Sequence, residues 1–393
     1  MRQKRHLRVL SETSGINRVA TACLERTAER GKQTINMSNR TAIILFASAS
    51  LTPAALLLAG AAFAGIWPLL ALLSMTVIVF ALDRFIGSLE AAASLSNWLP
   101  KVVGVVHFPV LASVIAAVGA SDGMPAGQKI LLIVAAGLYA GQVSNACAHE
   151  LIHRADRGSR ILGTAIYCSL LNGQHVSAHL LVHHVHAGTA HDPNSAPLGV
   201  GFYRYFARAW AAEFRAGWRA ETSRRKNAGA HRLHPYSVYV GGALLSLATA
   251  FVIGGTVGLT AFAIIALHAQ VQLFLSDYLQ HYGLRRAILP DGKPEPMGPQ
   301  HSWNAPHPYS SALMMNAPRH SDHHMRPGKS FVRLSHDPDT MPTLPRSVPV
   351  MGAIAFVPPV WRRMMDLRAA KWSGDPVQPK TSNPTATATF VTR

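Results

Sequence analysis

The sequence predicts an all-α integral membrane protein, with six transmembrane helices and a helical cap on the cytoplasmic side that carries histidine boxes. Apolar residues make up 49% of the 393 residues and charged residues only 14%, well below the roughly 25% of an average soluble protein. The apolar residues gather into long runs, and many of the 20 histidines lie just beyond the ends of these runs. These three features predict a membrane-embedded bundle with a polar, metal-binding end.

Six apolar runs are each about long enough to cross roughly 30 Å of hydrocarbon at 1.5 Å per residue. Short turns separate the runs pairwise, at Gly60–Gly65, Ser121–Gly127 and Gly254–Gly255, which predicts three helical hairpins. The predicted spans are residues 42–60, 65–82, 102–120, 129–148, 237–255 and 257–276.

An even number of crossings places both chain ends on one side, together with the long segments 149–236 and 277–393 that follow the fourth and sixth spans. Both segments are rich in arginine, and positively charged loops prefer the cytoplasm. The same bias accounts for most of the formal net charge of +18. Because no recognised nucleic-acid module is present, we expect membrane lipid and not nucleic acid as the partner of this charge.

The two ends of the chain differ from its middle. Residues 1–40 are polar and basic and lack the apolar core of a signal peptide, and residues 373–393 are rich in proline and threonine. We expect both to be disordered, with one membrane domain over 41–372. Within that domain, 161–172 is too short to span and predicts an interfacial or re-entrant helix, and 348–360 predicts a packing helix.

The cysteines argue against several kinds of site. Cys23, Cys147 and Cys168 form no C-x-x-C pair. A disulfide framework, a cysteine-ligated zinc site and a rubredoxin-like iron site within this chain are therefore all disfavoured.

Three histidine boxes and one isolated histidine carry the main functional signal. The first box is H-E-L-I-H from residue 149, the second is H-L-L-V-H-H from residue 179, and the third is H-S-D-H-H from residue 320. An i, i+4 spacing places two imidazoles on one face of a helix. The isolated histidine lies just past the sixth span. The candidate catalytic and metal ligands are His149, His153, His179, His183, His184, His281, His320, His323 and His324.

All four clusters follow the fourth or the sixth span, so they lie on one side of the membrane near its surface. Nine imidazoles are more than one zinc ion needs, since zinc normally takes four ligands. Two metals with open positions fit better. Imidazole suits iron among several metals, and oxygen activation requires open positions.

One competing interpretation starts from the first box, because H-E-x-x-H is also the zinc metalloprotease signature. There Glu150 would be the general base, but seven clustered histidines would remain unexplained. A non-enzymatic membrane scaffold is a further alternative.

The remaining histidines have two readings each. Near the second box, His175, His186 and His191 are interpreted either as loop residues or as groups behind the ligands. Before the third box, His301 and His307 are interpreted either as loop residues or as orienting partners of ligands. Inside the sixth span, His268 either serves the site or is satisfied by a neighbouring helix.

With these boxes, the chain resembles the bacterial alkane monooxygenase branch of the membrane fatty-acid-desaturase/hydroxylase superfamily. The resemblance runs from about residue 40 to 372. The part most particular to that branch is D-Y-L-Q-H-Y-G over 277–283, where the family pattern reads N-Y-x-E-H-Y-G. Four positions depart from the family: Asp277 replaces Asn, Gln280 replaces Glu, Ala178 stands where many members have Glu, and Arg154 replaces a common Lys.

The resemblance implies two iron ions held by the histidines, dioxygen as the oxidant and terminal hydroxylation of alkanes to primary alcohols. It also implies electrons from rubredoxin and its NADH-dependent reductase, and a location in the bacterial inner membrane. Xylene-type aryl-methyl monooxygenases and fatty acyl desaturases or hydroxylases remain alternatives, although H-x-x-H-H is the more usual second box of desaturases. In an apolar slot, the bulky Trp67, Met75 and Phe80 are candidates for limiting chain length, or else they face lipid or pack between helices.

Overall fold

The computed structural model is helical. It contains no β-strand among the residues described, apart from isolated bridges between Ile288 and Pro294 and between Asn304 and Thr343. The predicted all-α class is therefore confirmed for this part of the chain. Residues 1–38 and 374–393, nearly all of the two ends expected to be disordered, lie outside the described residues, as does Cys23. The described residues are 39–85, 95–120, 123–229 and 233–373.

Five helical segments of the described chain are long and apolar enough to cross a membrane, as expected of a membrane protein. Each of the first four contains most of one predicted span, while the fifth contains the last two. They are Arg40–Phe63, Trp67–Arg84, Asn97–Gly119, Ala126–Ile152 and Pro235–His281.

Two of these segments are interrupted helices. The second consists of two short helices that meet near Met75. The fourth contains a π-helical turn, η1, and polar side chains begin at this turn. π-Helical turns are rare and are frequent at functional sites. The elements of the first four segments are α2 (Asn39–Phe63), α3 (Trp67–Ser74), α4 (Val77–Phe85), α5 (Leu95–Gly119), α6 (Ala126–Tyr139), η1 (Ala140–Ser144) and α7 (Asn145–Ile152).

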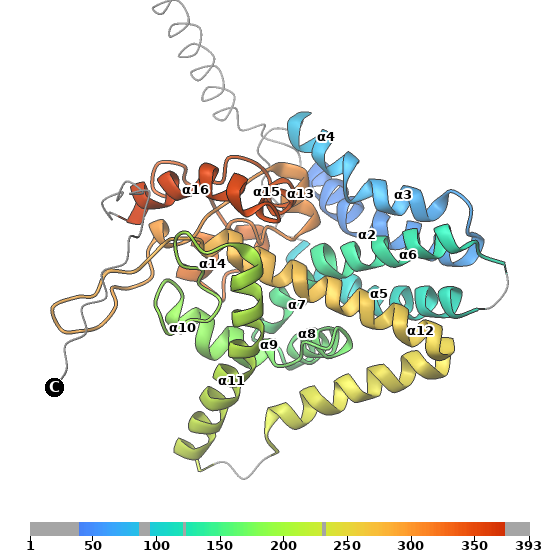
Figure 1. Cartoon of the computed structure of the whole chain (residues 1–393), viewed down its shortest axis with the longest axis horizontal. Coiled ribbons are helices and arrows are strands. Elements are labelled where there is room, and N and C mark those ends of the chain that lie inside the picture. Colours follow the sequence, from blue (N-terminus) through green and yellow to red (C-terminus); the bar gives the residue numbers. More distant parts are fainter. Residues whose placement is uncertain (1–38, 86–94, 121–122, 230–232, 374–393) are drawn as a thin grey trace, which may run out of the picture.

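The fifth segment is α12 (Pro235–His281), a single 47-residue element where two separate helices were predicted. Its backbone leaves the helical conformation at Gly255, with φ 59° and ψ −154°, which glycine adopts at little cost. The chain reverses there, and Figure 1 shows the two halves diverging from this bend. The predicted turn at Gly254–Gly255 is thus present within one long element.

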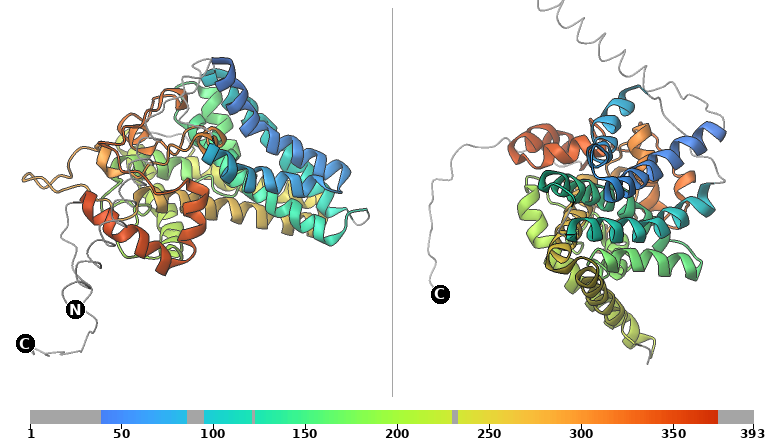
Figure 2. Two further views of the ribbon diagram at one scale, coloured as in Figure 1. Left: turned by 90° about the horizontal axis from the view of Figure 1, so that it is seen from above. Right: turned by 90° about the vertical axis from the view of Figure 1, so that its right-hand side faces the viewer.

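Shorter elements gather at the end of the bundle away from this bend (Figures 1 and 2). The predicted short helices over 161–172 and 348–360 correspond to α8 and to α15 with the start of α16. The shorter elements are α8 (Arg157–Ser169), α9 (His175–Ala178), η2 (His179–His183), α10 (His184–His186), α11 (Phe202–Asn227), η3 (Pro299–His301), α13 (Pro308–Leu313), α14 (His320–Met325), η4 (Phe331–Arg333), α15 (Val348–Ala355) and α16 (Pro358–Ser373).

An aromatic cluster holds the end of α12 against α16. The buried ring of Trp361 packs on those of Tyr278 and Tyr282, with centroids 5.3 Å away in both cases. The Tyr282 hydroxyl donates to Asp366 at 2.6 Å. Because His281 lies between these two tyrosines in the sequence, this packing fixes the position of its backbone.

Candidate metal centre

The structure brings all nine predicted histidines together in two adjacent groups. Within each group, one nitrogen from every ring lies within 4.8 Å of the others. The five-histidine group comprises His149, His153, His179, His184 and His323, and the four-histidine group comprises His183, His281, His320 and His324.

Ring nitrogens of the five-histidine group are spaced like the ligands of one ion. The Nε2 atoms of His153, His179 and His184 lie 3.0–3.1 Å from one another. An ion bound at the roughly 2.0–2.1 Å typical of zinc and imidazole would place neighbouring nitrogens about 2.9–3.3 Å apart. Three mutually close nitrogens cannot satisfy each other by hydrogen bonding, because each either carries a hydrogen or accepts one. A metal ion satisfies all three.

The four-histidine group has the same character and is fully buried. Nε2 of His320 lies 3.0 Å from Nε2 of both His281 and His324. Nε2 of His183 is buried and has no hydrogen-bond partner in the described part of the chain. Such a buried, unpartnered nitrogen is costly unless an ion binds it.

The π-helical turn η2 divides the second box between the two groups. We expected the i, i+4 pair His179 and His183 to share a face. Instead, His179 shares the five-histidine group with His184, five residues on, and His183 points into the other group. A π-helix has i→i+5 hydrogen bonds, so residues five apart lie nearly above one another. In the third box the adjacent His323 and His324 are divided in the same way.

A buried carboxylate orients the four-histidine group. Nδ1 of His183 lies 2.9 Å from Asp192, a residue that is only 3% exposed and that also accepts hydrogen bonds from Ser195 Oγ and the Asn194 amide. The Asn194 side chain in turn donates to Asp277 at 2.7 Å. A carboxylate behind a ligating histidine fixes its ring and makes it more basic.

Behind the five-histidine group lies a second histidine–carboxylate pair. Nδ1 of the buried His175 is 2.7 Å from Glu213 of α11, and the rings of His175 and His179 lie 5.0 Å apart. His175 belongs to neither group, so it supports His179 by packing. The sequence offered no signal for Glu213 or Asp192, because each lies outside the boxes.

Electrostatics keeps most of these rings neutral, which is the form that binds metal. Burial, followed by the neighbouring imidazoles, lowers the pKa of His153 to about 4 and holds those of His179, His320 and His323 well below the usual range. His183 is the exception. Burial is the largest single influence and opposes its charge, but the carboxylates of Asp192, Asp277 and Glu213 together outweigh burial and raise its pKa to about 9.

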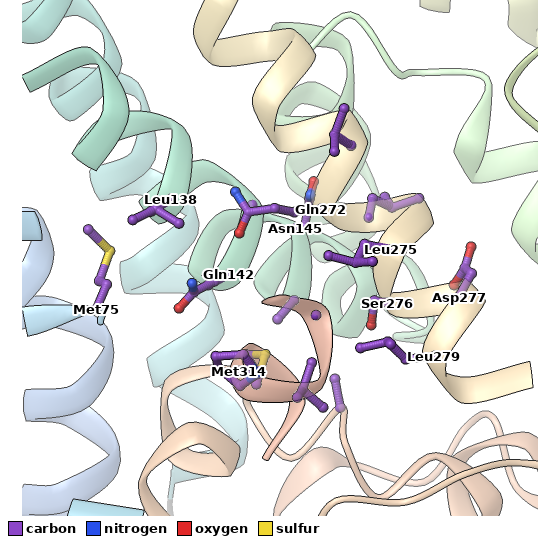
Figure 3. A pocket seen from close by; sticks show the side chains of 18 of the residues that line it. Met75, Leu138, Gln142, Asn145, Gln272, Leu275, Ser276, Asp277, Leu279 and Met314 are labelled. Carbon is purple, nitrogen blue, oxygen red and sulfur yellow. The ribbon is translucent and has the colours of Figure 1, made fainter. Parts of the chain in front are cut away.

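A cavity of about 620 Å³ extends from the two groups between the long helices. His149 and His179 of one group and His320 of the other line it. Aliphatic side chains from α4, α6, α12 and α15 form most of its wall, and Figure 3 shows Met75 and Leu138 on one side with Leu279 and Asp277 on the other. Of the three predicted limiting residues, Met75 and Phe80 line the cavity and Trp67 does not.

Similarity to known proteins identifies the family of this chain. The profile of the fatty acid desaturase family matches residues 128–354, which is more than half of the sequence and includes all nine histidines. The chain belongs to the fatty acid desaturase family. The resemblance inferred from the boxes is thereby confirmed.

Relatives within this family carry one name. The chain is 30% identical to alkane 1-monooxygenase 1 of Pseudomonas aeruginosa, over 63% of this chain and 65% of that relative. It is 26% identical to alkane 1-monooxygenase 2 of the same organism, over 81% and 89%, and 32% identical to alkane 1-monooxygenase of Acinetobacter baylyi, over 61% and 59%. In the first and third cases the match spans less than two thirds of the relative's length.

Three of the four departures from the alkane monooxygenase pattern have structural counterparts here. The carboxylate of Asp277 accepts the Asn194 amide, as described above. Gln280 uses both ends of its amide, accepting from Ser276 Oγ at 3.1 Å and donating to the carbonyl of Ala317 at 3.3 Å. A glutamate there could not donate. Ala178 lies where α9 and α11 approach closely, since a Cβ added at Gly217 would come within 3.0 Å of it.

Glu150 is directed away from the histidines. Its carboxylate pairs with Arg154 at 2.5 Å and accepts the backbone amide of Phe331 at 3.3 Å. It belongs to neither histidine group. The zinc-protease interpretation required this residue as a free general base, so the structure speaks against it.

The other histidines lie outside the two groups. His186 and His191 contact each other, with ring centroids 5.7 Å apart, and His301 bonds to Glu295 at 2.9 Å. His268 lines the cavity at a position that precedes His281 in α12.

Asn304, which lies two residues after Ser302, holds the first turn of α14. It does so through two hydrogen bonds to Ser321, at 3.0 and 2.8 Å.

Proposed function

We propose that the protein is a di-iron, O₂-dependent monooxygenase that hydroxylates the terminal methyl group of alkanes, or of similarly apolar molecules, to a primary alcohol. The observation that carries this proposal is the juxtaposition of two imidazole groups with one largely aliphatic cavity. The relatives named alkane 1-monooxygenase support the same activity.

The nine histidines are the proposed ligands of two iron ions. No carboxylate belongs to either group in the described residues, so the ligands would all be imidazoles, which suit iron among several metals. When bound, iron would activate O₂ as the oxidant that an unactivated C–H bond requires and that no side-chain acid or base can provide. The chain itself binds the substrate, aims its terminal carbon at the histidines and limits access of water.

The cavity suits a substrate that arrives from the membrane. Val77 and Phe80 line it and are 60% and 44% exposed, so it reaches the surface of the bundle between apolar side chains. Alkanes dissolve in the hydrocarbon of the bilayer, and an entrance at this depth shortens their path. Met75, which is fully buried in the cavity wall, is the better placed of the two lining residues to limit chain length.

We also propose the finer topology. The two halves of α12 would each cross the membrane, making six crossings over the catalytic domain 41–372. The arginine-rich α11 and the loops beside it would then face the cytoplasm by the positive-inside rule, with the histidines at that surface of the bacterial inner membrane.

Electrons would come from rubredoxin and its reductase. Three exposed arginines of α11, Arg208, Arg215 and Arg219, line a hollow of about 470 Å³. His191 and Asp192 line it as well, and Asp192 bonds directly to His183. The positive charge of these arginines would attract an acidic electron carrier. The carrier would then lie against the loop that contains Asp192 and supports the four-histidine group.

The decisive experiment measures metal and product together. Purified protein in membranes should contain about two irons per chain, and with rubredoxin, reductase and NADH it should convert octane to 1-octanol. Xylene and fatty acids in the same panel separate the related activities. His186→Ala, outside both groups, is the control and should keep both iron and turnover. One zinc without iron, or turnover of fatty acids alone, would overturn the proposal.

The docking of the carrier has its own test. Replacing Arg215 and Arg219 by Gln should raise the apparent KM for rubredoxin roughly tenfold and weaken its dependence on salt. The matched pair R204Q/K226Q removes the same charge from exposed positions of α11 outside the hollow. Equal effects of the two pairs would contradict docking at this site.

A further inference from the structure

A second apolar cavity, of about 610 Å³, shares no lining residue with the first. Its walls are stripes from α5, α8 and the first half of α12. Among the described residues that line it, Arg157 and Arg160 are the only charged ones. From this combination we infer that the groove binds one anionic phospholipid, with an acyl chain between the helices and the phosphate at the two arginines.

The groove lies along the first half of α12 between two close contacts with the body of the protein, where only Leu247 and Ala250 pack against the core. Near one end, a Cβ added at Gly242 would lie 2.8 Å from Cβ of Cys168. Near the other, a Cβ added at Gly119 would lie 2.4 Å from Cα of Gly254. Both contacts therefore depend on glycine. From residue 240 to 249, no residue of this half is buried.

The distance between these two contacts suits a lipid chain. Gly242 and Gly254 are twelve residues apart, about 18 Å along a helix. A helix of a second protein is roughly 10–12 Å across and would have to separate α12 from a body to which it is held at both ends. An acyl chain is thinner and enters lengthwise. Figure 1 shows the first half of α12 running below α8 and α5.

The charged end of the groove lies at the depth of lipid headgroups. Arg157 begins α8 only five residues after the fourth apolar segment ends at Ile152. Nη1 of Arg160 donates to the carbonyls of Ala155, at 2.8 Å, and Arg154, at 3.4 Å, which holds the guanidinium in place. Basic pockets between membrane helices are the usual sites of anionic headgroups.

Nearby charges favour an anion. Lys101 adds to the two arginines, whereas Arg154 is already paired with Glu150, and Asp156 directly precedes Arg157 in the sequence. Asp156 is already engaged, since it caps α8 by accepting the Ser159 amide at 2.9 Å and lies 3.9 Å from Lys101 Nζ. Phosphate oxygens would therefore meet a surplus of positive charge at this end of the groove.

The test uses the full-length protein in zwitterionic nanodiscs to which phosphatidylglycerol is added, with bound lipids counted by native mass spectrometry. Wild type should retain one phosphatidylglycerol. R157Q/R160Q should weaken that binding roughly 30-fold, as expected for loss of two basic contacts near a lipid surface. Ala112→Phe, which fills the groove from α5, should abolish it. R204Q/K226Q on α11, with the same loss of charge, should bind like wild type.

Three results would overturn the inference: equal loss in R157Q/R160Q and R204Q/K226Q, equal retention of phosphatidylcholine and phosphatidylglycerol, or a change of oligomeric state in Ala112→Phe without a change in bound lipid. The change of oligomeric state would mean that the groove is a contact surface between copies of the chain. The arginine pair lies on the surface and is not expected to impair folding, so its result stands even if Ala112→Phe fails to fold.

Discussion

The two histidine groups differ in depth and in support. All four rings of the four-histidine group are buried, whereas His149, His153 and His184 of the five-histidine group are partly exposed. A buried carboxylate bonds to His183 in the deeper group, while the other group is supported by the packing of His175. The deeper group is thus supported by a direct hydrogen bond to one of its rings, and the shallower one by ring packing.

The largest effect should come from removing a ligand from either group. His149→Ala, His183→Ala and His324→Ala should each lower alkane hydroxylation by more than about 100-fold, beyond the 10–100-fold that loss of an outer partner causes. Each should also lower bound iron from two toward one per chain, as measured by elemental analysis. Membrane insertion should be unchanged, and retained turnover in any one of them would remove that residue from the proposed ligands.

The next effect should separate the groups. Asp192→Asn keeps the shape of the side chain but removes the charge facing His183, so we expect roughly 10–100-fold weaker binding of one iron and a proportional loss of turnover. Iron titration followed spectroscopically should show one weakened and one unchanged site. Asp291→Asn, at an exposed carboxylate paired only with Lys293, is the control. Equal weakening of both sites would mean that the groups are not supported separately.

A smaller effect is expected behind the shallower group. Glu213→Gln replaces a hydrogen bond to a charged group, worth roughly 1.5–3 kcal/mol of stability, and should lower the Tm and perturb the spectrum of the five-histidine site while both irons stay bound. Glu221→Gln alters the other buried carboxylate of α11, which pairs with Arg224. It should lower the Tm without the spectral change. Identical spectra in both variants would reduce Glu213 to a packing role.

The smallest effect concerns the cavity that both groups share. Met75→Ala should shift the preference toward longer alkanes by about 1 kcal/mol per methylene, roughly fivefold in relative kcat/KM. Trp67→Ala removes a larger side chain that does not line the cavity, and it should leave the preference unchanged. Competition between alkanes of different length measures both. A shift in Trp67→Ala alone would place the substrate elsewhere.

Sequence reasoning reached much of this architecture because its signals are local. Long apolar runs identified each of the five membrane-length segments, and Gly255 marked the reversal in α12, whereas the 26-residue α11 was not predicted. The three histidine boxes supplied eight rings of the two groups, and the isolated His281 supplied the ninth. Departures from periodicity were less visible: nothing in the run 65–82 showed that α3 ends at Ser74, and an i, i+4 spacing gave no warning that η2 winds as a π-helix.

The sequence alone could not predict contacts between residues that are far apart in the chain. Asp192 and Glu213 lie in segments without a motif, and only the folded chain brings them to His183 and His175. The assignment of rings to groups depends on helix winding and on where α12 ends beside α14, which one sequence does not specify. The same holds for the groove beside Arg157, whose walls come from three separate helices.

Neighbouring residues on either side of a single peptide bond serve different groups, at His183 with His184 and again at His323 with His324. Consecutive Cα atoms are 3.80 Å apart, a distance fixed by covalent geometry. Two pairs of adjacent residues therefore join the two groups through the backbone, and the side-chain torsions of these histidines set how far apart two bound ions would lie. A movement of these histidine-bearing segments relative to the membrane would therefore displace both ions together.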